Sequence, residues 1–177
     1  MLIIGIGGLS RSGKSALAKQ LQAYYIDLGK TVCLIHQDEF VRHVNTIPKI
    51  NHRTDWEHPD SMDFEQQYKT VIENKNRFDI ILLEGILVFY NEDLNSLFDC
   101  RILCEIDKAN FIRRKRKDTR WGIEPDWYIE HIWESYFTYG RSILENTNPS
   151  ILDSIIIIQN HAFENKIGEL VALIENQ

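Results

Sequence analysis

Residues 8–15 have the side-chain types and spacing of a polyphosphate site. They read Gly8-Leu9-Ser10-Arg11-Ser12-Gly13-Lys14-Ser15, which fits the pattern G-x-x-x-x-G-K-[ST] between an apolar run and a helical pattern. Glycines let several backbone N–H groups converge, and the following helix N-terminus adds partial positive charge. We expect this segment to bind ATP, with Lys14 at the β- and γ-phosphates and Ser15 as a Mg²⁺ ligand.

Acidic residues follow two other apolar runs. Glu84 comes directly after residues 79–83, and Asp38 comes shortly after residues 31–35. Because sites in α/β proteins collect where parallel strands end, both carboxylates are expected at one edge of a sheet. Glu84 is suited to hold Mg²⁺, and Asp38 to accept the proton of an attacking hydroxyl. Glu39 is the alternative base. A solvated acidic turn is the alternative interpretation of Asp38 and Glu39, and an exposed strand-end glutamate is the alternative for Glu84.

The elements that must position these side chains follow from the apolar pattern. It predicts short strands at residues 2–6, 31–35, 79–83, 101–106 and 154–158. Helical spacing predicts helices over residues 14–28, 63–74, 126 to about 145, and about 163–175. A further helix is expected to begin near residue 108, and Asp60 is the expected cap of the helix at 63–74. Strands that alternate with helices pair in parallel, and nearly continuous apolar strands are typical of sheets covered on both faces. The sequence therefore predicts an α/β, three-layer P-loop NTPase fold with a five-stranded parallel sheet.

The sequence predicts a single structural domain. No internal repeat, low-complexity tract or linker divides the sequence, so we expect a single domain over residues 1–177. The longest irregular stretch covers residues 41–56. Loops of that length in compact domains are usually functional.

Charge and composition restrict the function classes. A formal net charge of −6 argues against a general nucleic-acid surface, although residues 113–120 hold six basic side chains in eight positions. That contrast suggests a small anionic ligand, with a solvated helix surface or RNA binding as alternatives; the interleaved aromatic residues of single-strand binders are missing. No apolar run approaches the roughly 20 residues that span a bilayer, and no export signal is expected. The three cysteines suit a reducing compartment, so we expect a cytoplasmic protein.

Several segments resemble, in order, the uridine kinase and nicotinamide riboside kinase family. They are the phosphate loop, Gln37-Asp38-Glu39-Phe40, Asp55-Trp56-Glu57-His58-Pro59-Asp60, Leu83-Glu84-Gly85 and the basic segment that ends Asp118-Thr119-Arg120. The resemblance spans most of the chain. It implies transfer of phosphate from ATP, with Mg²⁺, to the 5′-hydroxyl of a ribonucleoside.

The resemblance also implies roles for individual residues. Asp38 matches the family's base and Glu84 its strand-end glutamate, while Asp55 matches an aspartate that binds the ribose 2′- and 3′-hydroxyls. Trp56 and Phe40 are candidates to line the base pocket, although core packing is an equally good interpretation.

The basic run resembles the lid of these kinases, at about residues 113–125. Arg113, Arg116 and Arg120 are candidates to stabilise charge on the transferring phosphate. Of these, Arg116 is predicted to act with Lys14 and Asp38 in catalysis, and Arg120 to contact the nucleotide. Lys117 stands where the family leads us to expect arginine, and we include it among the candidate substrate contacts.

The identity of the acceptor stays open at this point. Within the family, the residues leave uridine, cytidine and nicotinamide riboside as acceptors. Outside it, a P-loop kinase of another small alcohol, such as a sugar acid, a pantothenate-like molecule or a sugar phosphate, is the alternative. A nucleotide-binding regulator without catalysis is a third hypothesis. The sequence does not indicate the oligomeric state.

Overall fold

A five-stranded parallel sheet forms the centre of the computed structural model, which describes residues 1–120, 122–141, 155–159 and 166–176. Its strand order is β2-β5-β1-β6-β7. The strands are β1 (Leu2–Gly8), β2 (Val32–His36), β5 (Ile80–Gly85), β6 (Cys100–Glu105) and β7 (Ile155–Gln159). They confirm the five predicted strands to within a few residues; position 154, expected to begin the last one, lies outside the described residues.

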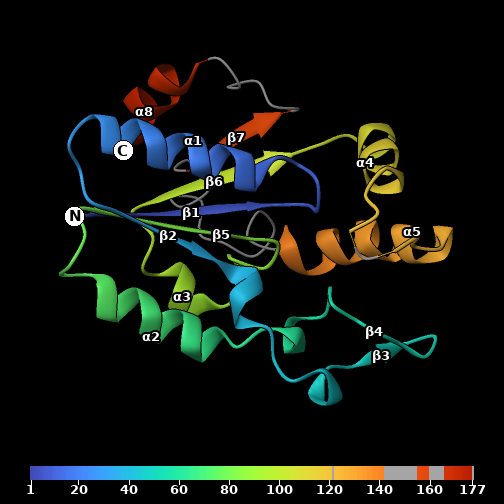
Figure 1. Cartoon of the computed structure of the whole chain (residues 1–177). Helices are drawn as coiled ribbons and strands as arrows, with labels where there is room; N and C mark the ends of the chain where they lie inside the picture. Colours follow the sequence, from blue (N-terminus) through green and yellow to red (C-terminus); the bar gives the residue numbers. More distant parts are fainter. Residues whose placement is uncertain (121, 142–154, 160–165, 177) are drawn as a thin grey trace.

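Helices cover both faces of this sheet (Figure 1). One face carries α1 (Lys14–Asp27) and α8 (Ile167–Glu175), and the other carries α2 (Phe64–Asn74) and the short α3 (Glu92–Asn95). Leu21 and Leu170 pack with Ile4 on the first face, whereas Val71 packs with Ile81 on the second. Because both faces are buried, the strands are apolar at nearly every position. The α/β, three-layer fold is therefore confirmed.

Two further helices lie beyond the carboxyl ends of the strands (Figure 1). They are α4 (Lys108–Arg116) and α5 (Asp126–Ser135), and α5 continues as a π-helical turn, η4 (Tyr136–Gly140). Phe111 of α4 and Ile132 of α5 are completely buried in a cluster that also holds Leu9 of the phosphate loop. This cluster fixes both helices against the segment that follows β1.

The expected irregular stretch contains a small antiparallel hairpin. After β2 the chain forms the 3₁₀ turns η1 (Gln37–Phe40) and η2 (Val44–Thr46), the strands β3 (Lys49–Ile50) and β4 (Arg53–Thr54), and the turn η3 (Pro59–Ser61). Asn51 and His52 connect the hairpin strands with φ values of 46° and 65°. Two left-handed residues in succession match the twist of a tight hairpin.

Several predicted helix boundaries need correction. Asp63, not Asp60, caps α2, because its side chain accepts a hydrogen bond from the backbone N–H of Gln66 at 2.9 Å. The helix expected to reach about 145 is α-helical only as far as Ser135, and positions 142–145 lie outside the described residues. Positions 163–165 of the last predicted helix also lie outside them. Within the described part of the chain, no helix has the length and apolar character needed to cross a bilayer.

Candidate active site

The phosphate loop, residues 8–15, has the backbone geometry of an anion cradle. Gly8 has φ 150°, and a Cβ at this position would lie 2.4 Å from the carbonyl oxygen of Cys104 and 2.6 Å from Ser12 Oγ. Arg11 adopts φ 65°, and the Ser12 N–H donates to the Leu9 carbonyl at 3.0 Å. Such a turn at the start of a helix directs successive N–H groups toward one point. Only glycine fits at position 8, which explains its place in the motif.

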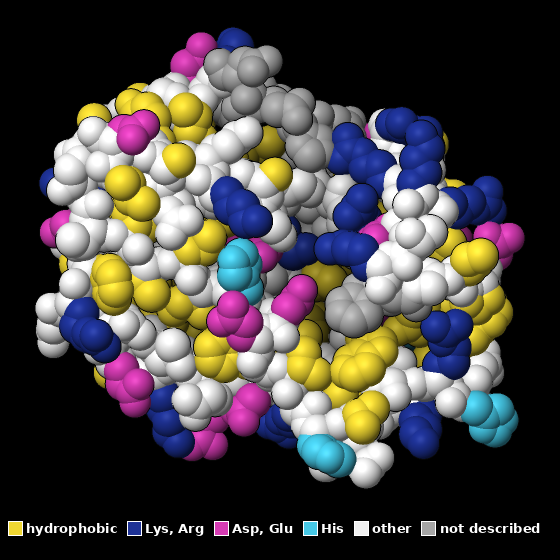
Figure 2. Space-filling view, in the orientation of Figure 1, with side chains coloured by type: hydrophobic (Ala, Val, Ile, Leu, Met, Phe, Trp, Pro, Cys, Tyr) yellow, Lys and Arg dark blue, Asp and Glu magenta, His cyan; other side chains and the backbone are white. Residues whose placement is uncertain are grey.

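A cavity of about 800 Å³ opens beside this loop. That volume lies in the range of small-molecule sites. Figure 2 shows Lys and Arg side chains gathered beside the hollow, with acidic side chains on its opposite side. The residues used below that line it are Ser10, Arg11, Gly13, Lys14, Ser15, Asp38, Arg53, Trp56, Glu57, Arg114, Lys115, Arg120, Glu124 and Tyr128. We call the part lined by the phosphate loop and α4 its phosphate end, and the part lined by Arg53, Trp56, Glu57 and Tyr128 its acceptor end.

Glu84 lies directly beside the phosphate loop. The Ser15 hydroxyl donates to Glu84 Oε1 at 3.0 Å, and His36 Nδ1 lies 2.7 Å from the same oxygen. The side chain is buried, and its Oε2 has no hydrogen-bond partner among the described residues. A hydroxyl and a carboxylate oxygen are ligands that Mg²⁺ prefers.

This donor set fits a magnesium ion that is shared with phosphate. Within the described ranges, no group of three or more His, Cys, Asp and Glu side chains is arranged to hold a metal by itself. Mg²⁺ in phosphotransferases is usually held by one or two protein oxygens, substrate phosphates and water. Ser15 and Glu84 are therefore the side chains here that would hold it.

Asp38 lines the cavity from η1, where a buried glutamine fixes the backbone. Gln37 is completely buried; its Oε1 accepts the Leu87 N–H at 2.8 Å, and its Nε2 donates to Gln67 Oε1 at 3.0 Å. The amide also fills the space beside Gly85, where a Cβ would lie 2.3 Å from Gln37 Oε1. This packing presents the exposed carboxylate of Asp38 to the cavity.

The neighbours of Asp38 point elsewhere. Glu39, the alternative base, is exposed and does not belong to the described cavity lining. Phe40 is half-buried and packs against the apolar cluster between the sheet and α2. The core-packing interpretation of Phe40 therefore agrees with its position.

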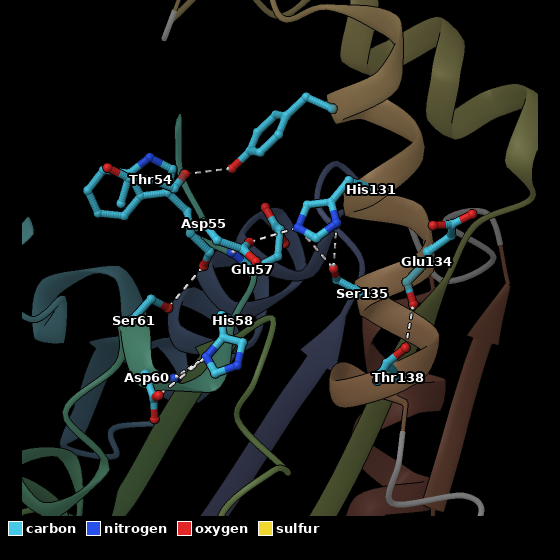
Figure 3. A network of polar contacts seen from close by, with 12 residues as sticks. Thr54, Asp55, Glu57, His58, Asp60, Ser61, His131, Glu134, Ser135 and Thr138 are labelled. Carbon is cyan, nitrogen blue, oxygen red and sulfur yellow. Dashed lines mark hydrogen bonds and ion pairs between the residues drawn. The ribbon is translucent and has the colours of Figure 1, made fainter. Parts of the chain in front are cut away.

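The acceptor end brings Trp56 and Glu57 into the cavity lining, but not Asp55. Trp56 is 43% exposed and lines the cavity, so part of its indole ring is accessible to a ligand. Asp55 is buried, and its Oδ1 lies 2.8 Å from Nε2 of His131 on α5 (Figure 3). Asp55 thus contacts protein where the family resemblance had predicted ribose binding.

Glu57 is the acidic side chain of this segment that reaches the cavity. It is 7% exposed, and its Oε2 has no hydrogen-bond partner among the described residues. Burial raises its pKa to about 7, the positive charges of Lys115 and Lys14 oppose this rise, and Asp55 adds to it. A buried carboxyl with an unpaired oxygen is suited to bind a hydroxyl of a ligand.

The basic segment contacts the phosphate loop through two groups, Arg114 and Asp118. Arg114 Nη1 donates to the Arg11 carbonyl at 3.2 Å. Asp118 accepts hydrogen bonds from Arg120 at 2.7 and 2.8 Å and lies 3.5 Å from Arg11 Nη1. The hydrogen bonds from Arg120 hold the pKa of Asp118 well below its usual range. Lys115 pairs with Glu124 at 3.0 Å, and both side chains are nearly buried.

The predicted lid residues are divided between the cavity and the surface. Arg120 lines the cavity. Arg116 instead pairs with Asp126 at 2.9 Å on the exposed side of α4. Lys117 ends α4 as an exposed residue, and Arg113 is also exposed and bonds to Asn110. Arg116, Lys117 and Arg113 do not belong to the described cavity lining.

Sequence reasoning missed Arg114 and Lys115, although a signal for them existed. Phe111 is buried, and residues three and four positions later lie on the same face of a helix. This spacing from Phe111 selects Arg114 and Lys115 as the inward basic residues. Glu57, by contrast, could be distinguished from Asp55 only through the contact of Asp55 with His131, 76 positions away.

Comparison with known proteins places this chain in a family. No protein-family model matches it. A uridine kinase from Chlamydia pneumoniae is 30% identical over 200 aligned positions, covering 97% of this chain and 87% of the relative. A nicotinamide riboside kinase from Eremothecium gossypii is 24% identical over 192 positions, covering 82% of this chain and 78% of the relative.

A solved structure supports the same fold. It is described as a possible uridine kinase from Bacillus stearothermophilus, and it superimposes with a TM-score of 0.54 at 20% identity over 88% of each chain. At that identity the likeness concerns the fold. Together with the relatives and the site geometry, it leads to one conclusion: the chain belongs to the uridine kinase and nicotinamide riboside kinase family of P-loop nucleoside kinases.

Proposed function

We propose that this protein transfers the γ-phosphate of ATP to the 5′-hydroxyl of a ribonucleoside. The observation that carries the proposal is that one cavity of about 800 Å³ is lined by the phosphate loop, by the carboxylate of Asp38 and by the acceptor end. A donor phosphate and an acceptor hydroxyl can therefore be held together, which supplies much of the catalysis of phosphoryl transfer.

Asp38 is the proposed base. Its carboxylate lines the cavity together with Lys14, so a hydroxyl bound there would lie between the proton acceptor and the phosphate site. Asp38 orients that hydroxyl and accepts its proton as the oxygen attacks phosphorus. Lys14, Arg114 and Arg120 place positive charge where negative charge spreads over the transferring group. Arg114 takes the role that the sequence assigned to Arg116.

Ser15 and Glu84 are the proposed magnesium ligands. Bound Mg²⁺ neutralises charge on the phosphate oxygens. The buried, unpaired Oε2 of Glu84 supports this assignment, because such an oxygen is costly unless a ligand satisfies it. Ser15 contributes the hydroxyl that now donates to the other oxygen of the same carboxylate.

Glu57 is the proposed ribose-binding carboxylate, in place of Asp55. Its unpaired Oε2 and its position in the cavity lining support the change. A charged acceptor for the 2′- and 3′-hydroxyls favours ribose over deoxyribose, because it is left unsatisfied by the wrong sugar. Trp56 offers an aromatic face on which a base can stack. The relatives named above leave uridine, cytidine and nicotinamide riboside as the acceptors to compare.

The test is ADP release with Mg-ATP against a panel of nucleosides and non-nucleoside alcohols. The panel contains uridine, cytidine, nicotinamide riboside, adenosine and pantothenate, and Asp38→Asn is the matched control. Nucleoside-dependent release that Asp38→Asn reduces by at least about 100-fold supports the proposal. Turnover of pantothenate alone would favour the kinase of another alcohol. Tight ATP binding with no acceptor-dependent release would favour a regulator.

A further inference from the structure

A buried polar connection joins α5 to the acceptor end of the cavity (Figure 3). His131 projects from α5 toward Asp55, and its Nε2 lies 2.8 Å from Asp55 Oδ1. The two side chains are only 17% and 10% exposed. Because a carboxylate oxygen accepts hydrogen bonds, this contact uses Nε2 of His131 as the donor.

The same carboxylate oxygen also contacts the backbone of Glu57. Asp55 Oδ1 accepts the Glu57 N–H at 3.2 Å, so one oxygen connects His131 to the residue that lines the cavity. The Asp55 N–H in turn donates to the Pro48 carbonyl at 2.8 Å. The position of Glu57 thus depends on the orientation of Asp55, and that orientation depends on His131.

Neighbours on α5 hold the imidazole in place. The hydroxyl of Ser135, one helical turn later, lies 3.3 Å from Nε2 and 3.5 Å from Nδ1 of His131. The ring of Tyr128, one turn earlier, lies 5.7 Å from the imidazole between centroids. Tyr128 also donates its hydroxyl hydrogen to the Thr54 carbonyl at 3.4 Å, which gives α5 a second contact with this segment.

We propose that His131 is a positioning residue for nucleoside binding, acting through Asp55 to hold Glu57 and Trp56 in the geometry that receives the nucleoside. This inference rests on the proposed function and adds a residue that does not itself line the described cavity. A buried pair of this kind contributes little net stability compared with apolar side chains of similar volume. Its value here is to fix one orientation of a segment whose own strands are two residues long.

The principal test compares His131→Leu with His131→Gln. His131→Leu keeps a side chain of similar bulk but removes the N–H donor, whereas the Gln amide can still donate to Asp55. We expect His131→Leu to raise the KM for nucleoside about tenfold while the KM for ATP changes less than twofold. His131→Gln should recover most of the lost affinity. Equal rises in both KM values, or no rise for nucleoside, would overturn the proposal.

His58→Leu is the matched control. This histidine lies on the same segment, but its Nδ1 faces the exposed Asp60, accepting the Asp60 N–H at 3.2 Å (Figure 3). It should leave both KM values within twofold of the wild type. A tenfold rise in the nucleoside KM for His58→Leu would mean that any change in the segment disturbs binding, and would overturn a specific role for His131.

Two measurements keep the test decisive if a variant folds poorly or if the wild type lacks nucleoside turnover. Asp55→Ala removes the acceptor of the same pair, and combining it with His131→Leu should add less than twofold to the nucleoside KM. Hydrogen exchange of peptides covering residues 55–62 needs no substrate. His131→Leu should accelerate their exchange about tenfold and leave the peptides of residues 8–15 unchanged; equal rates in both proteins would overturn the proposal.

Absence of nucleoside-dependent ADP release in the wild type would instead refute the proposed function. The exchange measurement would then still decide whether His131 positions the segment. Failure of one conclusion is therefore distinguishable from failure of the other.

Discussion

At the phosphate end of the cavity most contacts come from one continuous segment, whereas at the acceptor end they come from segments far apart in the chain. Residues 8–15 form the cradle by themselves, through a strand, a turn and the first residues of α1. The acceptor end needs Glu57, Asp55 and His131, and the last two are 76 positions apart. The phosphate end is thus a local backbone structure, and the acceptor end is a tertiary arrangement of side chains.

This difference suggests how the two ends respond to change. Backbone N–H groups at a helix start recognise any phosphate and require little from neighbouring side chains. The position of the Glu57 carboxyl depends on a chain of hydrogen-bonded side chains, and changing any member of that chain should move it. Substitutions at the phosphate end should therefore affect all acceptors equally, and substitutions at the acceptor end should distinguish between them.

The largest effect is expected from Lys14→Met. Removing the charge that we propose to lie at the β- and γ-phosphates should lower kcat/KM for ATP about 1,000-fold, in line with the loss of one key group that stabilises transition-state charge. The loss should be the same with every nucleoside that is turned over. Steady-state kinetics with two acceptors measures this loss. A loss that differs tenfold between acceptors would contradict the conclusion that the phosphate end acts equally on all acceptors.

Glu57→Gln should change the pH dependence of stability. The folded-state pKa of about 7 exceeds the ordinary 4.5, so the folded protein binds more protons than the unfolded chain between these pH values. The contribution of this group to stability is therefore full below pH 4.5 and is lost as the pH rises toward 7. One pKa unit corresponds to about 1.4 kcal/mol, so Glu57→Gln should stabilise the protein by about 3 kcal/mol at pH 8 and by less than about 1 kcal/mol at pH 5.

Denaturant unfolding at the two pH values measures this effect. Asp38→Asn is the control, because this carboxylate lines the same cavity but is exposed. Its stability should follow that of the wild type. A Glu57→Gln variant with equal gains at both pH values would show that burial does not perturb this carboxyl.

The same substitution should weaken acceptor binding. Above pH 7, where the Glu57 carboxyl is ionised, Gln retains an acceptor oxygen but loses the charge, and charge-assisted hydrogen bonds are roughly twice as strong as neutral ones. We expect the KM for a ribonucleoside to rise about tenfold, with the KM for ATP unchanged. Initial rates with a ribonucleoside and its 2′-deoxy analogue measure the effect. If Glu57→Gln raises the KM for the 2′-deoxy analogue as much as the KM for the ribonucleoside, Glu57 does not bind the 2′-hydroxyl.

The smallest effect is expected from Arg116→Ala. Arg116 pairs with Asp126 on the exposed side of α4, and exposed pairs of this kind contribute about 0–1 kcal/mol. The kcat/KM for ATP should change less than threefold. Arg114→Ala is the neighbouring comparison and should lower the same constant by about tenfold or more. If Arg116→Ala lowered kcat/KM for ATP more than Arg114→Ala does, the assignment of the inward face of α4 would be refuted.

The contrast between the two ends also explains what the sequence could predict. The five strands were predicted because each depends on a short stretch of residues, and the same holds for the placement of the phosphate loop, of Glu84 in β5 and of Asp38 in η1. Residues 113–117 are all basic, so this run alone does not indicate which of its side chains face inward, and Arg116 was chosen over Arg114. The buried Phe111, one turn earlier, is the residue that indicates the inward face.

Asp55 and Glu57 show the other kind of limit. They are two residues apart and both acidic, and the chain between them forms a turn that no strand or helix period describes, so the pattern could not separate them. Only the position of His131 on α5, set by tertiary packing, determines which of them faces the cavity. Such information is absent from any local window of the sequence.

The packing of Gln37 against Gly85 has a consequence for how this protein can evolve. A methyl group at position 85 would collide with the amide that accepts the Leu87 N–H and bonds to Gln67 of α2. Neither residue is proposed to touch a substrate. In a saturation scan, both positions should nevertheless tolerate as few replacements as Lys14. Selection would then preserve this glutamine and this glycine through changes of acceptor, as a mark of shared ancestry rather than of shared specificity.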